Sequence, residues 1–222
     1  IGKSALGNNE TGEYNTAVGK SAMQANTTAS NNTAIGKSAL LTNTTGFQNT
    51  AVGAAALDAN TTANYNTGIG ADALTANTTG AENTAVGMNT LASNTTASNN
   101  TAIGAGSLNA NTTAADNTAV GRHSLLSNTT GSQNTALGSL ALDANTTADY
   151  NVAVGYGALS ANTTGASNTA IGRATLLDNT TADNNTGVGF EALKANTTGI
   201  DNVAVGSLCL DAKLPTPELP CP

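Results

Sequence analysis

The chain has 222 residues, of which 7 are Lys or Arg and 14 are Asp or Glu, giving a net charge of −7. The shortage of basic residues argues against a nucleic-acid partner, because phosphate binding needs a dense basic face. No apolar run approaches the roughly 20 residues needed to span a bilayer, and no charged-then-apolar secretory leader opens the chain.

Large aliphatic residues and charged residues are both scarce. Leu, Ile, Val and Phe make up about 17% of the chain, a level at which disorder is the usual expectation. Disorder by that route also needs high charge, and only 9% of the residues in the chain are charged. The composition therefore indicates a low-complexity chain with regular order.

One 17-residue repeat runs through nearly the whole chain, from a partial first copy that starts at Ile1. If the Asn that opens each copy is position one, position five is always Gly, and position twelve is Asn in every full copy, from Asn26 to Asn196. A period this short and regular predicts a solenoid whose copies stack in register. The opening residues are Asn15, Asn32, Asn49, Asn66, Asn83, Asn100, Asn117, Asn134, Asn151, Asn168, Asn185 and Asn202.

Each copy begins with a predicted strand at positions two to four, for example residues 33–35. Position two is Thr or Val and position four is Val, Ile or Leu, so we expect both to face the core. Ala or Gly at position three should then face outward. Gly at position five suits a corner with positive φ. The first corner residues are Gly19, Gly36, Gly53 and Gly70.

A second predicted strand carries Leu or Met at position nine, the other large core residue, and ends at an Asn-Thr-Thr corner. Asn tolerates the left-handed conformation that a corner requires. Since β-branched residues, Gly and Asn are poor helix formers, we predict an all-β fold. It is a parallel β-solenoid of 17-residue coils with two short strands each. About thirteen coils occupy residues 1–211, and a Pro-rich tail or cap follows at 212–222.

The row of small residues at position three bears on the oligomeric state. One Val and one Leu per coil bury too little apolar surface to offset the ordering of a coil, so more surface must be buried elsewhere. Outward Ala and Gly would let a neighbouring chain approach closely, which predicts a parallel homotrimer. End-to-end joining into a filament is a further form of self-association. The alternative is that small residues let the two sides of one thin coil collapse together.

The segments "NTAVGKSA" at residues 15–22 and "NTAIGKSA" at 32–39 resemble the head repeats of trimeric autotransporter adhesins. In those heads three chains form left-handed parallel β-rolls. Similar NTAVG and NTT arrays are found in phage tail fibres and secreted bacterial surface proteins. The resemblance covers Ile1 to about Asp211 and implies a location outside the cell, on a cell surface or on a virion. The period of 17 residues is longer than is usual in adhesin heads.

The two Asn rows are expected to stack into amide ladders with a structural role. The rival interpretation is N-glycosylation, since Asn-Thr-Thr is also an acceptor motif, but a laddered amide could not be modified. The ladder residues include Asn15, Asn32, Asn49, Asn66, Asn83 and Asn100 at position one, and Asn26, Asn43, Asn60 and Asn77 at position twelve.

The remaining motifs do not indicate a phosphate-binding, metal or catalytic site. Gly-Lys-Ser recurs at residues 2–4, 19–21 and 36–38 without the earlier Gly that a phosphate-binding loop needs. His123 has no second His with which to share a metal, and Asp58 and Asp143 share a repeat position but fall five coils apart. We therefore predict no enzyme, no cofactor and no metal site.

The two cysteines of the sequence, Cys209 and Cys221, are twelve residues apart. We predict a disulfide that holds the tail over the last coil if the protein is exported, and a link between chains is the rival. The predicted function is a structural, non-enzymatic extracellular fibre or adhesin rod, whose partners are copies of itself and a ligand on a host surface or matrix. The alternative is ice binding by the stacked rows of Thr27, Thr44, Thr61 and their successors.

Overall fold

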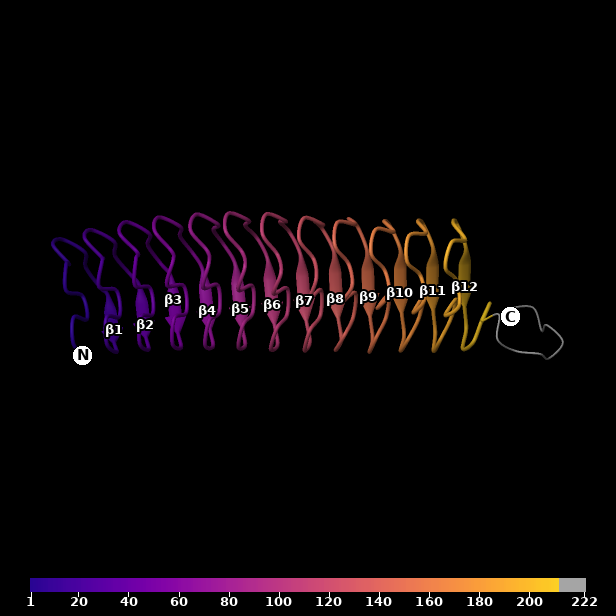
Figure 1. Ribbon diagram of the computed structural model, residues 1–222, viewed down its shortest axis with the longest axis horizontal. Helices are drawn as coiled ribbons and strands as arrows, with labels where there is room; N and C mark the ends of the chain where they lie inside the picture. Colours follow the sequence, from indigo (N-terminus) through magenta and orange to yellow (C-terminus); the bar gives the residue numbers. More distant parts are fainter. Residues whose placement is uncertain (212–222) are drawn as a thin grey trace.

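The computed structural model describes residues 1–211, which form one stack of similar coils (Figure 1). Each of twelve coils contributes a three-residue strand to a single parallel sheet, in which every strand pairs with its neighbours in sequence. Residues 1–211 contain no helix. The strands are β1 Thr16–Val18, β2 Thr33–Ile35, β3 Thr50–Val52, β4 Thr67–Ile69, β5 Thr84–Val86, β6 Thr101–Ile103, β7 Thr118–Val120, β8 Thr135–Leu137, β9 Val152–Val154, β10 Thr169–Ile171, β11 Thr186–Val188 and β12 Val203–Val205.

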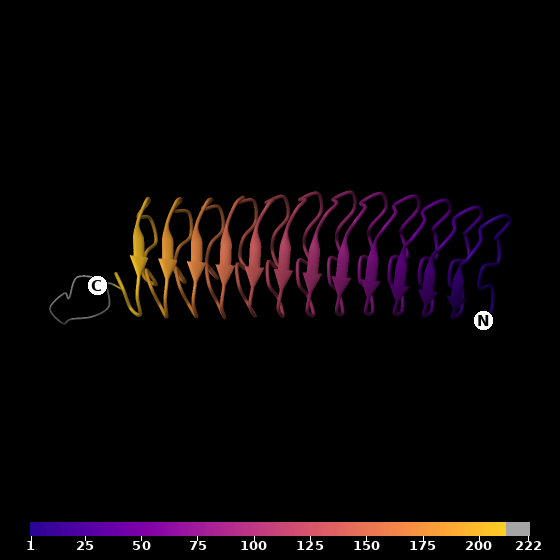
Figure 2. The same cartoon turned by 180° about the vertical axis from the view of Figure 1, so that it is seen from behind.

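Equivalent residues of successive copies lie one above the other. Thr33 pairs with Thr16 on one side and with Thr50 on the other, and the same offset of 17 holds along the sheet. The Gly53 amide donates to the Ile35 carbonyl at 2.8 Å, one coil earlier. The predicted all-β parallel β-solenoid with one coil per 17 residues is confirmed, and β1 and β12 lie at opposite ends of the rod (Figure 2).

The prediction of a second strand in each coil is wrong. Positions seven and nine have positive φ, for example 54° at Ala55 and 52° at Leu57, whereas positions six and eight do not. This alternation curls the backbone, so no extended segment forms. This segment still forms hydrogen bonds to both neighbouring coils. The Leu57 amide donates to Ala73 O at 3.0 Å, and the Ala55 amide donates to Lys37 O at 2.9 Å.

The predicted orientation of the strand is also wrong. Position three is the buried position in all twelve strands, and positions two and four are half-buried or exposed. The reason is the large residue on the opposite side of the coil: a Cβ added to Gly68 would lie 3.3 Å from Leu57 Cγ, so nothing larger than Ala fits there. The small residues let the two walls of one thin coil meet, and they offer no surface to a neighbouring chain.

The Gly corner at position five has φ between 122° and 142°, a region that strongly favours glycine. A Cβ on Gly53 would also collide with the carbonyl group of Gly70 in the next coil. The expectation that Asn takes the left-handed conformation at the Asn-Thr-Thr corner is wrong, because no Asn at position one or twelve of residues 1–211 has a positive φ. The left-handed residue is instead position seventeen, the last of each copy, for example Asn31 at 61° and Tyr65 at 60°.

Two kinds of coil alternate along much of the rod, according to whether position fifteen is Gly or Ala. A Cβ on Gly80 would collide with the Ala97 carbonyl of the next coil. In this Gly coil the Thr79 amide donates to Thr95 O at 3.2 Å, and the Ala81 amide donates to Ser98 Oγ at 3.0 Å. In this Gly coil a short polar side chain of the next coil thus accepts a hydrogen bond; the Ala115 amide, in a coil with Ala114 at position fifteen, donates in the same way to Ser132 Oγ at 3.2 Å.

Candidate binding surface on the sheet

The most uniform exposed surface is the outer side of the sheet, which we call the sheet face. It consists of positions two and four of β1–β12, and none of these residues is charged. Ile103, for example, is 40% exposed. Position two contributes Thr16, Thr33, Thr50, Thr67, Thr84, Thr101, Thr118, Thr135, Val152, Thr169, Thr186 and Val203. Position four contributes Val18, Ile35, Val52, Ile69, Val86, Ile103, Val120, Leu137, Val154, Ile171, Val188 and Val205.

The threonine hydroxyls of the sheet face differ from those of the Asn-Thr-Thr corner. No hydrogen bond within residues 1–211 involves a hydroxyl at position two, so these groups are available to an outside partner. At the corner, by contrast, Thr44 Oγ1 donates to Thr61 O at 3.1 Å and Thr61 Oγ1 donates to Thr78 O at 3.2 Å. The Thr rows predicted to bind ice thus hold successive coils together.

The Asn side chains at position twelve lie inside the coil. Asn60 is fully buried, and its Nδ2 donates both to Asn43 Oδ1 at 2.9 Å and to Ala63 O at 3.1 Å. Since Nδ2 carries two hydrogens, its donor capacity is used. The same two bonds recur at Asn77, where they measure 3.2 and 2.9 Å. The amide nitrogen that glycosylation would modify is therefore inaccessible in the ten copies from Asn26 to Asn179, where this side chain is fully buried.

The Asn side chains at position one form a second buried row. Asn49 Nδ2 donates to Ala63 O at 2.8 Å, which links the start of one copy to its own fifteenth position. The Asn49 backbone amide donates to Asn32 Oδ1 at 2.9 Å, one coil earlier. These side chains bond to backbone amides and carbonyls just before the strand begins, where no strand partner is present. Together the two Asn rows provide hydrogen-bond partners for polar groups that are buried inside the thin coil.

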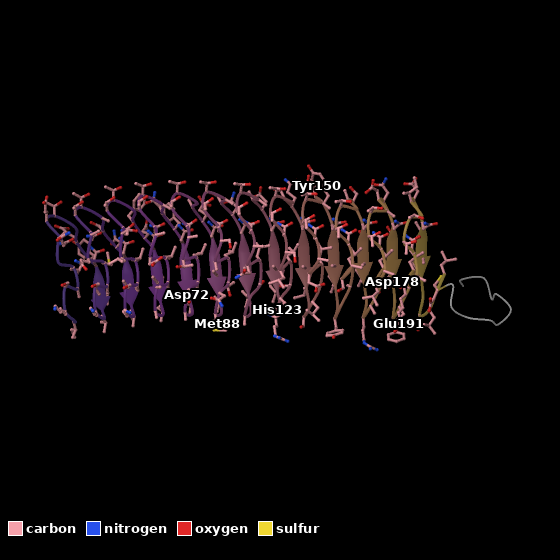
Figure 3. The ribbon with its side chains drawn as sticks, in the orientation of Figure 1. Asp72, Met88, His123, Tyr150, Asp178 and Glu191 are labelled. Atoms are coloured by element: carbon pink, nitrogen blue, oxygen red, sulfur yellow. The ribbon has the colours of Figure 1, made fainter. Side chains whose placement is uncertain are left out.

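Several charged and aromatic side chains project from the two edges of the coil, whereas Asp58, Asp143 and Lys194 lie at position ten, beside the buried Leu row. Met88, His123 and Glu191 project from one edge and Tyr150 from the opposite edge (Figure 3). At the first edge Arg173 lies over the Phe190 ring at 5.4 Å, and Lys194 forms an ion pair with Glu191 at 2.9 Å. The exposed residues Lys3, Lys20 and Lys37 belong to the same edge at position six.

The other residues considered as candidate sites stay apart. Asp58 Oδ1 accepts a hydrogen bond from Thr75 Oγ1 at 3.0 Å, and Asp143 Oδ1 accepts one from Ser160 Oγ at 2.6 Å. His123 is half-buried and packs over Gly106, where an added Cβ would lie 2.7 Å from His123 Cδ2. Nowhere in residues 1–211 do three His, Cys, Asp or Glu side chains gather as metal ligands would.

Cys209 is buried in the last coil, but Cys221 and the predicted cap at 212–222 lie outside the described residues, so the disulfide stays a prediction. Within the described part of the chain, no helix has the length and apolar character to cross a membrane.

Sequence reasoning missed the sheet face, because it placed positions two and four in the core. The signal that could have found it is the Thr at position two. Thr is retained in ten of the twelve strands, although a buried strand position would favour Val.

Comparison with known protein families, characterised proteins and solved structures gave no match to this chain.

Proposed function

We propose that this chain is a non-enzymatic rod, a stalk or head segment of an extracellular fibre, adhesin or filament. One observation carries the proposal: the register of the sheet is unbroken over all twelve strands, so each coil repeats the contacts of the one before. In such a stack stability is a sum of coil and nearest-neighbour terms, and length is set by the number of coils. This is the property that a spacer needs.

The location of the rod is proposed from the resemblance described above. The resemblance to adhesin heads and to NTAVG and NTT arrays of tail fibres supports a cell-surface or virion-surface position. Self-association belongs to the same proposal, and the resemblance implies a parallel homotrimer. Because the Ala row at position three is buried, contact between copies must use another surface.

The rod proposal predicts that length can be changed without loss of folding. Residues 49–82 make one two-coil unit, and we expect a variant with this block duplicated to fold as the parent does. The distance between spin labels at Asn31 and Ser167 should grow by two rungs, roughly 10 Å. Electron paramagnetic resonance measures this distance directly, and circular dichroism reports folding. A duplicated variant that unfolds, or whose labels do not move apart, would contradict the proposal.

Ice binding is a second candidate, now assigned to the sheet face instead of the corner. The observation that favours it is a straight, uncharged array of free Thr hydroxyls beside a row of Val and Ile, a pattern similar to the Thr arrays of ice-binding β-solenoids. A thermal-hysteresis measurement tests it against an unrelated protein of equal concentration. Hysteresis that is lost on Thr84→Tyr and Thr101→Tyr but kept on Thr79→Tyr would support this candidate, whereas activity equal to the control would remove it.

A further inference from the structure

The apolar row of the sheet face is not uniform, because two sizes of residue alternate along it. From β1 to β11 the odd-numbered strands carry Val at position four, and the even-numbered strands carry Ile or, in β8, Leu. The larger residues are also more exposed: Ile35, Ile69 and Ile103 are 41%, 39% and 40% exposed, whereas the Val residues of the odd-numbered strands β3 to β11 are half-buried. The row is therefore a line of ridges and hollows with a period of two coils.

We propose that the sheet face packs against the sheet face of a second copy of this chain, running antiparallel to the first. An identical row has the same ridges and hollows, so a shift of one rung places each Ile against a Val. Alternation of large and small residues across facing positions is how packed layers interdigitate. An ice plane has no matching hollows, and the Val rungs would stand short of it.

The polar row decides the direction of the two rods. If a two-fold axis runs along the strands, the copies are antiparallel, position four faces position four, and position two faces position two. Threonine hydroxyls then meet threonine hydroxyls, which both donate and accept. If the axis ran along the rod instead, each apolar row would face a Thr row, and buried hydroxyls would lose their partners at a cost. A parallel pair is therefore disfavoured, and the antiparallel dimer takes the place of the parallel homotrimer that the resemblance implies.

The alternation also selects the register. With the two-fold axis between β6 and β7, Ile103 of one copy faces Val120 of the other, and Ile69 faces Val154. Any register displaced by two rungs keeps the same rule. The contact is isologous, since each copy contributes the same surface.

The size of the face sets the expected affinity. Twelve rungs spaced by about 4.8 Å and about 10 Å wide offer roughly 500 Å² per copy. Two copies would bury about 1,000 Å², which is near the lower limit for a specific interface. We therefore expect a dimer that dissociates on dilution, not an obligate one. This inference rests on the proposed rod, because only a straight stack of coils presents such a face.

Sedimentation equilibrium of the full chain over a range of concentrations tests the dimer. We expect a monomer–dimer equilibrium that Ile69→Lys together with Ile103→Lys abolishes, since two charges per copy would be buried without partners. The matched control is Leu41→Lys together with Leu126→Lys, half-buried leucines at position ten that lie outside the sheet face, and it should still dimerise. Circular dichroism confirms that each variant is folded.

Removal of the ridges is the sharper test, because it keeps the face apolar. Ile103→Val removes one methylene from each copy, and burial of a methylene contributes about 0.8 kcal/mol. The dimer should weaken on the order of tenfold. An ice-binding face would keep its hysteresis after this change.

Spin labels distinguish the direction of pairing. A label at Asp116, near the proposed two-fold axis, should lie close to its counterpart in the other copy, whereas a label at Asn31 should lie on the order of 50 Å from its own. Short distances at both sites would show parallel rods and overturn the proposal. A trimer, or a monomer at all concentrations with or without thermal hysteresis, would also overturn it. The rod proposal would survive each of these results if duplication of residues 49–82 still lengthens the molecule.

Discussion

Each coil has two walls, the strand wall at positions two to four and the opposite wall that carries Leu or Met at position nine. Both form hydrogen bonds between coils, but their backbone conformations differ. The strand wall, such as β6, is extended, buries only Ala102 and turns Thr101 and Ile103 outward. The opposite wall alternates the sign of φ and buries Leu108 completely. Both walls donate hydrogen bonds to neighbouring coils. The difference teaches that a ladder between coils does not require two strands, and that a large residue on one wall requires a small one on the other.

Truncation of the large buried residue on the opposite wall should lower the stability of the protein most. We expect Leu108→Ala to lower the free energy of unfolding by about 2–5 kcal/mol, because the small residues around it cannot fill the cavity. Chemical denaturation followed by circular dichroism measures the change. Leu126→Ala, at a half-buried position on the same wall, is the matched control and should cost much less. Equal losses would show that the two leucines are equally buried.

The converse change tests the strand wall. Ala102→Leu should destabilise the protein by about 1–3 kcal/mol through overpacking, since Ala102 is fully buried between the walls. Ile103→Ala, one residue along the strand, should lower the stability of the monomer less, because Ile103 is 40% exposed. The original prediction of an outward position three gives the reverse order, so this pair of variants decides between the two orientations.

The fold was predictable from the sequence because it depends on the period. A spacing of 17 residues that never slips places like residues on adjacent rungs, whatever the shape of the coil. The Gly at position five was predictable for the same reason, because a repeated Gly indicates a repeated corner.

The shape within the coil was not predictable from residue types. Strand alternation gives two possible faces for Thr-Ala-Val, and hydrophobicity favours burial of Val. The opposite choice wins because the interior already contains Leu and two Asn side chains per coil, a tertiary constraint that no short segment reveals. Likewise, positive φ at Leu57 and Ala55 has no local signal, since neither residue favours that region.

The corner that joins the two walls offers a third test. Asn94 is fully buried, donates to Asn77 Oδ1 at 2.8 Å and to Ala97 O at 3.0 Å, and accepts from Asn111 Nδ2 at 2.9 Å. Asn94→Ala should cost about 1–3 kcal/mol, because it leaves buried polar groups without partners. The control is Asn109→Ala at the half-buried position ten, which should change the denaturation midpoint far less. A near-neutral Asn94→Ala would show that water replaces the ladder.

The smallest expected effect concerns the return from the corner to the strand wall, where the two kinds of coil differ. Ser98 Oγ accepts a hydrogen bond at 3.0 Å from the Ala81 amide of the preceding Gly coil. Ser98→Ala should lower the free energy of unfolding by about 0.5–1.5 kcal/mol, the usual net contribution of one such bond. It should also speed amide hydrogen exchange at Ala81 alone, which nuclear magnetic resonance can follow. Ser167→Ala, an exposed serine at position seventeen, should change neither quantity. Unchanged exchange at Ala81 after Ser98→Ala would mean that the alternation of coils reflects close backbone packing alone.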